Sequence, residues 1–185
     1  MSGHSKSSPI QPAALRILGI DPGSLHTGYG LIEKSGSAVT ALDAGRLSCP
    51  GGLGVPQRLA WLAQCLGERL AAWQPELAVL ETPFHGMNSR SLIVLAEARG
   101  ALLAVLAGRG IEIREYTPSE VKSAVTGNGR ADKEQVARMV RLLVGATAAE
   151  GRRWAADATD ALAVALCCAQ RLRMDRLRDG AADPK

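Results

Sequence analysis

Blocks of apolar residues separated by turn-forming residues predict five strands. They cover residues 15–21, 27–33, 39–47, 77–80 and 111–116. The turn Lys34-Ser35-Gly36 between the second and third blocks predicts that these two strands pair antiparallel. The last two blocks are each preceded by a segment with helical spacing. This order predicts an α/β domain whose five-stranded mixed sheet has its first three strands antiparallel and is flanked by helices.

Apolar residues at intervals of three and four predict helices between and after these strands. They cover residues 57–73, 91–107, 118–126, 132–145 and 155–173. Thr117 with Glu120 matches the capping-box pattern that begins a helix, and Asp132 with Gln135 begins the next one. The segment 91–107 is apolar on nearly every side, so we expect both the sheet and a second copy of the chain to cover it.

Composition fits a single domain. The chain has 185 residues, of which 46% are hydrophobic and 22% charged, and this excludes disorder of the whole chain. We expect a disordered leader at residues 1–14, the domain at 15–173 and a basic, flexible tail at 174–185. No uninterrupted apolar run approaches about 20 residues, which argues against a membrane span. The cysteines lack metal-ligand spacing, which predicts free thiols in a reducing cytoplasm.

Four acidic residues stand where a solvated surface would not ordinarily place them. Asp21 ends the first strand and Glu81 ends the fourth, whereas Asp157 and Asp160 lie one turn apart on the last helix, on the same face. If the first and fourth strands are parallel neighbours, both strand-end carboxylates reach the crevice at the carboxyl edge of the sheet. Each acid alone has an ordinary explanation as a turn, cap or helix-start residue. The set together favours a metal site.

Close carboxylates cannot all stay ionised without a counter-cation. Oxygen ligands without a His or Cys cluster suit Mg²⁺ or Mn²⁺ rather than zinc. A pair of such ions about 3.5–4 Å apart stabilises both the attacking and the leaving oxygen of a phosphodiester displacement. The formal net charge of +4 also leans toward a polyanionic partner.

Four segments occur in an order that matches a known family. They are ILGIDPGSLHTGYGLIE (17–33), LETPFHGMNSRS (80–91), VKSAVTGNGRADKEQV (121–136) and DATDALAVALC (157–167). Together they resemble the RuvC family of Holliday-junction resolvases, over about residues 15–173. The resemblance implies a ribonuclease-H-like fold with Asp21, Glu81, Asp157 and Asp160 as catalytic residues and as ligands of two Mg²⁺ or Mn²⁺ ions.

The same resemblance implies an activity and its partners. It implies a cytoplasmic, homodimeric endonuclease that binds four-way DNA junctions in recombination and repair. Paired symmetric nicks would leave 3′-hydroxyl and 5′-phosphate ends, with a metal-activated water as the nucleophile. A branch-migration motor of the RuvA-RuvB type would be a partner, and no membrane would be involved.

Candidate DNA contacts lie in two loops and the segment between them. They are Phe84, Asn88, Arg90, Lys122, Asn128, Arg130 and Lys133. The resemblance suggests that Phe84 stacks on a base, although a core position beneath the loop is the alternative. The basic surplus beside the Gly-Asn-Gly loop fits phosphate contact, and Lys122 and Lys133 match basic positions of the family.

Two other classes of protein share part of this pattern. Actin-like and sugar-kinase ATPases also place a glycine hairpin after strand-Asp-x-Gly, but they need a second lobe for which 185 residues leave no room. A junction-binding clamp that does not cut DNA would be expected to lose one of the four acids, and all four are present. His26 and His85 could act as general bases, but a metal-activated water needs neither, so we assign both to loops.

Overall fold

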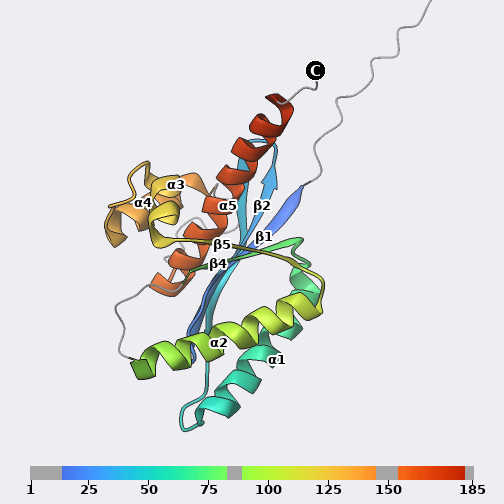
Figure 1. Cartoon of the computed structure of the whole chain (residues 1–185), viewed down its shortest axis with the longest axis vertical. Coiled ribbons are helices and arrows are strands. Elements are labelled where there is room, and N and C mark those ends of the chain that lie inside the picture. Colours follow the sequence, from blue (N-terminus) through green and yellow to red (C-terminus); the bar gives the residue numbers. More distant parts are fainter. Residues whose placement is uncertain (1–13, 83–88, 145–153, 182–185) are drawn as a thin grey trace, which may run out of the picture.

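The computed structural model describes residues 14–82, 89–144 and 154–181, with side chains up to residue 172. Figure 1 shows the strands crossing the middle of the molecule with helices packed around them. The strands are β1 (Leu15–Asp21), β2 (His26–Ser35), β3 (Ala38–Ser48), β4 (Leu77–Glu81) and β5 (Glu112–Tyr116). They form one five-stranded sheet in the order β3-β2-β1-β4-β5. The predicted mixed sheet is confirmed. Strand β2 pairs antiparallel with both β1 and β3, whereas β4 pairs parallel with both β1 and β5.

The helices are α1 (Val55–Trp73), α2 (Ser89–Gly108), α3 (Pro118–Thr126), α4 (Lys133–Leu143) and α5 (Ala156–Ala181). Both predicted helix starts are confirmed, since Thr117 with Glu120 and Asp132 with Gln135 form reciprocal capping boxes. Helix α4 ends at Leu143, before the predicted end at Gly145, because Val144 already has extended backbone angles.

The last helix is longer than the sequence analysis predicts. Helix α5 continues through Ala181, eight residues past its predicted end at Arg173. The segment beyond Arg173 contains Met174, Arg176, Leu177 and Arg178, which favour helix, and has no proline before Asp183. A high density of charge was therefore not a signal for the helix end.

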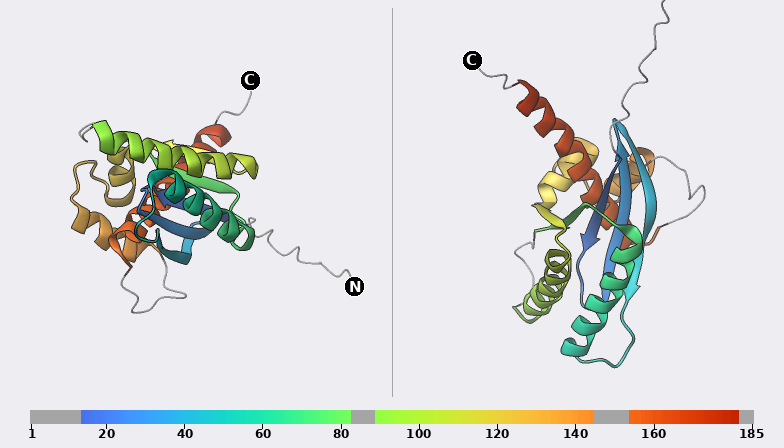
Figure 2. Two further views of the ribbon diagram at one scale, coloured as in Figure 1. Left: turned by 90° about the horizontal axis from the view of Figure 1, so that it is seen from below. Right: turned by 90° about the vertical axis from the view of Figure 1, so that its right-hand side faces the viewer.

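Side chains alternate along the strands, so each strand contributes to two separate cores. One core lies under α3, α4 and α5 and includes Ile17, Val79 and Leu162, whereas the other lies under α1 and α2 and includes Leu18, Leu80 and Leu102. The two views of Figure 2 show helices on both sides of the sheet. Asp21 and Glu81 follow the alternation of Ile17 and Val79, so their side chains belong to the α5 side.

The sequence pattern argues against a membrane span, yet helix α2 meets the length and composition of one. Within the described residues it is the one helix that is long and apolar enough to cross a membrane, judged by length and composition alone. Its inner side packs on the protein, because Ala98, Leu102 and Leu106 are buried in the core beside α1. Its outer side is apolar and open, and Ile93 is 59% exposed.

Candidate active site

The ends of β1 and β4 bring the first two predicted acids together. Parallel pairing matches Ile17 with Leu77 and Ile20 with Leu80. The same register, carried one residue further, places Asp21 beside Glu81 at the carboxyl edge of the sheet. The condition that the sequence prediction required, parallel neighbouring strands, is thus confirmed.

Helix α5 lies directly on the backbone of β1 and β2, and this close approach brings its acids to the strand ends. A Cβ atom added to Gly19 would lie 2.0 Å from the carbonyl oxygen of Ala161, and one added to Gly28 would lie 2.0 Å from that of Asp157. Real Cβ atoms do not come so near to a carbonyl oxygen. Only glycine at these two positions lets the first turns of α5 sit at this height above the sheet.

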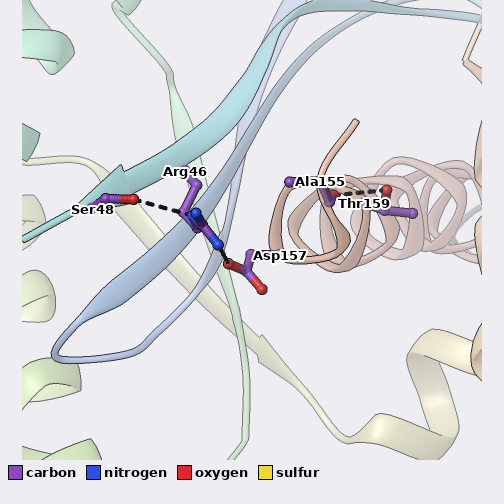
Figure 3. Close-up of polar contacts among 5 residues, drawn as sticks. All are labelled: Arg46, Ser48, Ala155, Asp157 and Thr159. Carbon is purple, nitrogen blue, oxygen red and sulfur yellow. Dashed lines mark hydrogen bonds and ion pairs between the residues drawn. The ribbon is translucent and has the colours of Figure 1, made fainter. Parts of the chain in front are cut away.

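Three of the four predicted carboxylates share one cavity. Asp21, Glu81 and Asp160 line a cavity of about 230 Å³ together with side chains of α3 and α4. Asp157 is not among the residues that line this cavity. Its carboxylate instead meets a guanidinium, with Arg46 Nη1 3.5 Å from Asp157 Oδ2 (Figure 3). The spacing on α5 correctly predicted one face for both acids, but the side chains point to different partners.

Burial and mutual repulsion raise the pKa of the strand-end acids. The pKa of Asp21 is raised to about 7, first by burial and then by the charges of Asp160, Asp157 and Glu81. The pKa of Glu81 is also raised, first by burial and then by Asp160, while Lys122 and Lys133 act in the opposite direction. These shifts mark a site where negative charge is concentrated beyond what solvent and nearby lysines neutralise.

Two of the predicted basic residues stand at the cavity. Lys122 of α3 and Lys133 of α4 both line it. Lys133 Nζ lies 3.6 Å from Asp160 Oδ2, and 87% of the Lys133 side chain is exposed. An exposed ammonium at the rim can exchange its carboxylate partner for a phosphate with little cost, because such pairs contribute little to stability.

The other predicted DNA contacts are placed differently. Phe84 and Asn88 lie outside the described residues, as does His85. Asn128 supports a turn, since its Oδ1 accepts the backbone N–H of Arg130 at 2.9 Å, and the Arg130 side chain is exposed. None of the residues in this turn lines the carboxylate cavity. Arg90 lines a second cavity of about 540 Å³, beside the β1–β2 turn and His26.

Arg99 is a buried contact to the site that sequence reasoning missed. This residue of α2 is 8% exposed, and its Nη1 donates to the carbonyl oxygen of Glu81 at 2.8 Å. Its Nη2 forms an ion pair with Glu115 of β5. Arg99 therefore ties the backbone of Glu81 to the helix on the opposite face of the sheet. A single arginine in the middle of an apolar helix was the available signal.

The donor set suits hard divalent cations, although two of the four acids pair with basic side chains. The cavity offers carboxylate oxygens and no thiol or imidazole. Within the described residues, no group of three or more His, Cys, Asp or Glu side chains is arranged to hold a metal ion as it stands. Asp157 and Asp160 instead contact Arg46 and Lys133. The chemistry thus fits a divalent metal on condition that these two acids turn from their basic partners.

A mixed five-stranded sheet with carboxylates at the ends of β1 and β4 and on α5 defines a ribonuclease-H-like nuclease. The family model described as "Crossover junction endodeoxyribonuclease RuvC" matches residues 17–168. The chain belongs to the RuvC family.

Curated relatives and solved structures agree with this assignment. The crossover junction endodeoxyribonuclease RuvC of Alkalilimnicola ehrlichii is 48% identical over 154 residues, which cover 82% of this chain and 89% of the relative. That of Anaeromyxobacter sp. strain K is 44% identical over 151 residues, covering 82% and 78%. The structure of Thermus thermophilus RuvC in complex with Holliday junction substrate has a TM-score of 0.79 at 30% identity, covering 87% of this chain and 96% of that one. Yeast mitochondrial Ydc2, at 17% identity and a TM-score of 0.67, shares the fold over 93% of this chain and 85% of its own.

Proposed function

We propose that this protein binds four-way DNA junctions as a homodimer and resolves them by paired, symmetric nicks. The observation that carries the proposal is that carboxylates from three elements distant in sequence, Asp21, Glu81 and Asp160, line one cavity in a chain of the RuvC family. The Thermus relative of known structure was solved with a Holliday junction, which supports the choice of substrate. Resolution of junctions would serve recombination and repair in the cytoplasm.

The four carboxylates would divide the binding of two divalent ions among them. Asp21 is central, because its pKa responds to all three other acids, and it would contact both ions. Glu81 would hold one ion, and Asp157 with Asp160 the other. Two bound Mg²⁺ or Mn²⁺ ions would supply an activated water and stabilise the leaving oxygen of the phosphodiester. Such ions would also offset the burial and the mutual repulsion that raise the pKa of Asp21 and Glu81.

Basic side chains around the cavity would position the DNA backbone. Lys122 and Lys133 reach the cavity from α3 and α4, which places positive charge where a phosphate must enter. Arg90 and Arg130 are exposed further from the acids and would contact more distant phosphates. Phe84, Asn88 and Asn128 would also contact the junction.

The outer side of α2 would form the dimer contact. Ile93 and Val94 line a groove of about 620 Å³ between α2 and the start of α1, with Val55, Pro56 and Leu59 on its other side. A second copy bound there would cover the apolar surface that the monomer leaves open. Two active sites related by a two-fold axis match the symmetry of a four-way junction, and a branch-migration motor of the RuvA-RuvB type would share that DNA.

Labelled synthetic junctions with Mg²⁺ test the proposal through two contrasting variants. Asp160→Asn removes a metal ligand without removing basic surface, so we expect junction binding within about twofold of the parent and cleavage reduced by at least about 10³-fold. Lys122→Ala removes one phosphate contact, so we expect weaker binding and a salt dependence shallower by about one unit. Gel-shift titrations and mapping of the nicks measure both. Binding without any nick in the unmodified protein would favour a non-cutting clamp.

A further inference from the structure

Arg46 connects the far strand of the sheet to the acidic end of α5. It lies on β3, and strand register aligns it with Gly28, which is aligned in turn with Asp21. Because Gly28 has no side chain, the long side chain of Arg46 can reach over β2 to α5. Figure 3 shows its guanidinium between Ser48 and Asp157. Arg46 Nε donates to Ser48 Oγ at 3.1 Å, and Nη1 lies 3.5 Å from Asp157 Oδ2.

This contact accounts for the separate position of Asp157. The other three acids line the carboxylate cavity, whereas Asp157 faces the guanidinium. Side chains of both partners are accessible, 43% exposed for Arg46 and 31% for Asp157, so the pair can open without loss of core packing. An arginine stays charged at every accessible pH, so its attraction for Asp157 does not weaken under the conditions in which the nuclease would act.

We propose that Arg46 is an internal counter-ion that competes with divalent cations for Asp157 and thereby sets the metal concentration at which the site fills. This inference rests on the proposed function, because it takes Asp157 as a metal ligand. A cation that binds Asp157 shares the carboxylate with the guanidinium and is repelled by its positive charge, so the two compete for Asp157. Arg46 is thus a positioning residue that acts through Asp157.

Manganese binding to the full chain without DNA tests the competition directly. Titration with Mn²⁺, followed by the electron paramagnetic resonance signal of the free ion, gives the dissociation constant of the site. Arg46→Gln should tighten Mn²⁺ binding by about two- to fivefold, the range of an exposed ion pair. Arg46→Glu should tighten it further, because it adds an anion in place of a cation. The differences should shrink at high salt.

Arg16→Gln is the matched control, because Arg16 and Glu33 form an ion pair of similar length at the opposite end of the sheet. Their N–O distance is 3.6 Å, with 38% and 34% of the side chains exposed. We expect its Mn²⁺ affinity to equal that of the parent. Thermal melting of each variant checks that the fold is retained.

The outcomes separate this inference from the proposed function. If Mn²⁺ does not bind, or if Asp160→Asn does not weaken its binding, the metal site itself is overturned. A normal site whose affinity is unchanged or weakened in both Arg46 variants would overturn the competition and leave the nuclease proposal intact. Tighter binding in the order Glu, Gln, Arg at position 46 would establish it.

Discussion

The two faces of the sheet are built from alternate residues of the same strands, yet they meet their helices in opposite ways. On the α5 face, Gly19, Gly28 and Gly30 present bare backbone, and a helix rests directly on it. On the α1 and α2 face, bulky residues such as Ile20 and Leu31 meet leucines of the helices in a thick apolar layer. Close approach on one face positions carboxylates, whereas bulk on the other buries apolar area.

A glycine on the α1 and α2 face makes room for a side chain rather than for a helix. Gly45 of β3 gives room to an aromatic ring, since a Cβ added there would lie 2.6 Å from the hydroxyl oxygen of Tyr29. Tyr29 lies against Trp73, with ring centroids 4.7 Å apart, and Arg69 stacks over both rings. Glycine therefore admits a helix on one side of the sheet and a side chain on the other, and only the first arrangement brings acids together.

The largest effect is expected where the close approach is blocked. Gly19→Ala places a methyl group 2.0 Å from the carbonyl oxygen of Ala161, so α5 must move away from β1. We expect a loss of at least about 3 kcal/mol in the free energy of unfolding, at the upper end for overpacking, together with loss of cleavage. Urea denaturation followed by circular dichroism measures the first effect.

Gly67→Ala on α1 is the control on the opposite face. A Cβ there would have its nearest neighbour, Arg109 Nη2, at 3.5 Å, which is ordinary contact. Alanine in a helix interior should stabilise the protein by about 0.5–1 kcal/mol. If both variants had the same stability, packing against α5 would not be the reason that glycine is required on that face.

The second-largest effect is expected where charge is removed from the α5 face without added volume. The pKa of Asp21 is raised from 3.8 to about 7, so between these values the unfolded chain releases a proton that the folded chain keeps. The wild-type protein without metal therefore loses stability as pH rises from about 4 to 7. Asp21→Asn escapes this loss and should be more stable by on the order of 2 kcal/mol at pH 8.

Urea denaturation in EDTA at pH 4 and pH 8 measures this difference. At pH 4 Asp21 is protonated in the folded chain and about half protonated in the unfolded chain, so little of the loss has occurred and the two proteins should be close in stability. A difference that stayed the same at both pH values would mean that the asparagine acts through packing or hydrogen bonding. Addition of Mn²⁺ should stabilise the wild type and leave the variant less affected.

The sequence predicts the strands and where the four acids lie on the strands and on α5, because both depend on local pattern. A strand-end acid such as Asp21 is visible from the apolar run before it, and the spacing of Asp157 and Asp160 is fixed by the helix itself. Arg46 could not be found in this way, since its partner is 111 residues away and the contact depends on strand register. The end of α5 was missed because charged residues tolerate both helix and coil.

The smallest effect concerns the open side of the α1 and α2 face. Ile93 is 59% exposed in the monomer, where its replacement by serine should change the free energy of unfolding by less than about 0.5 kcal/mol. If a second copy covers α2, Ile93→Ser should weaken dimerisation about tenfold, because each copy loses part of an apolar contact. Sedimentation equilibrium over a range of protein concentrations measures the dissociation constant.

Leu142→Ser on α4, where the leucine is 68% exposed, is the matched control and should leave the dimer unchanged. Equal weakening of the dimer by both variants would place the dimer contact somewhere other than α2. An effect confined to Ile93 would assign the two faces of the sheet separate roles, the α5 face in chemistry and the α1 and α2 face in assembly.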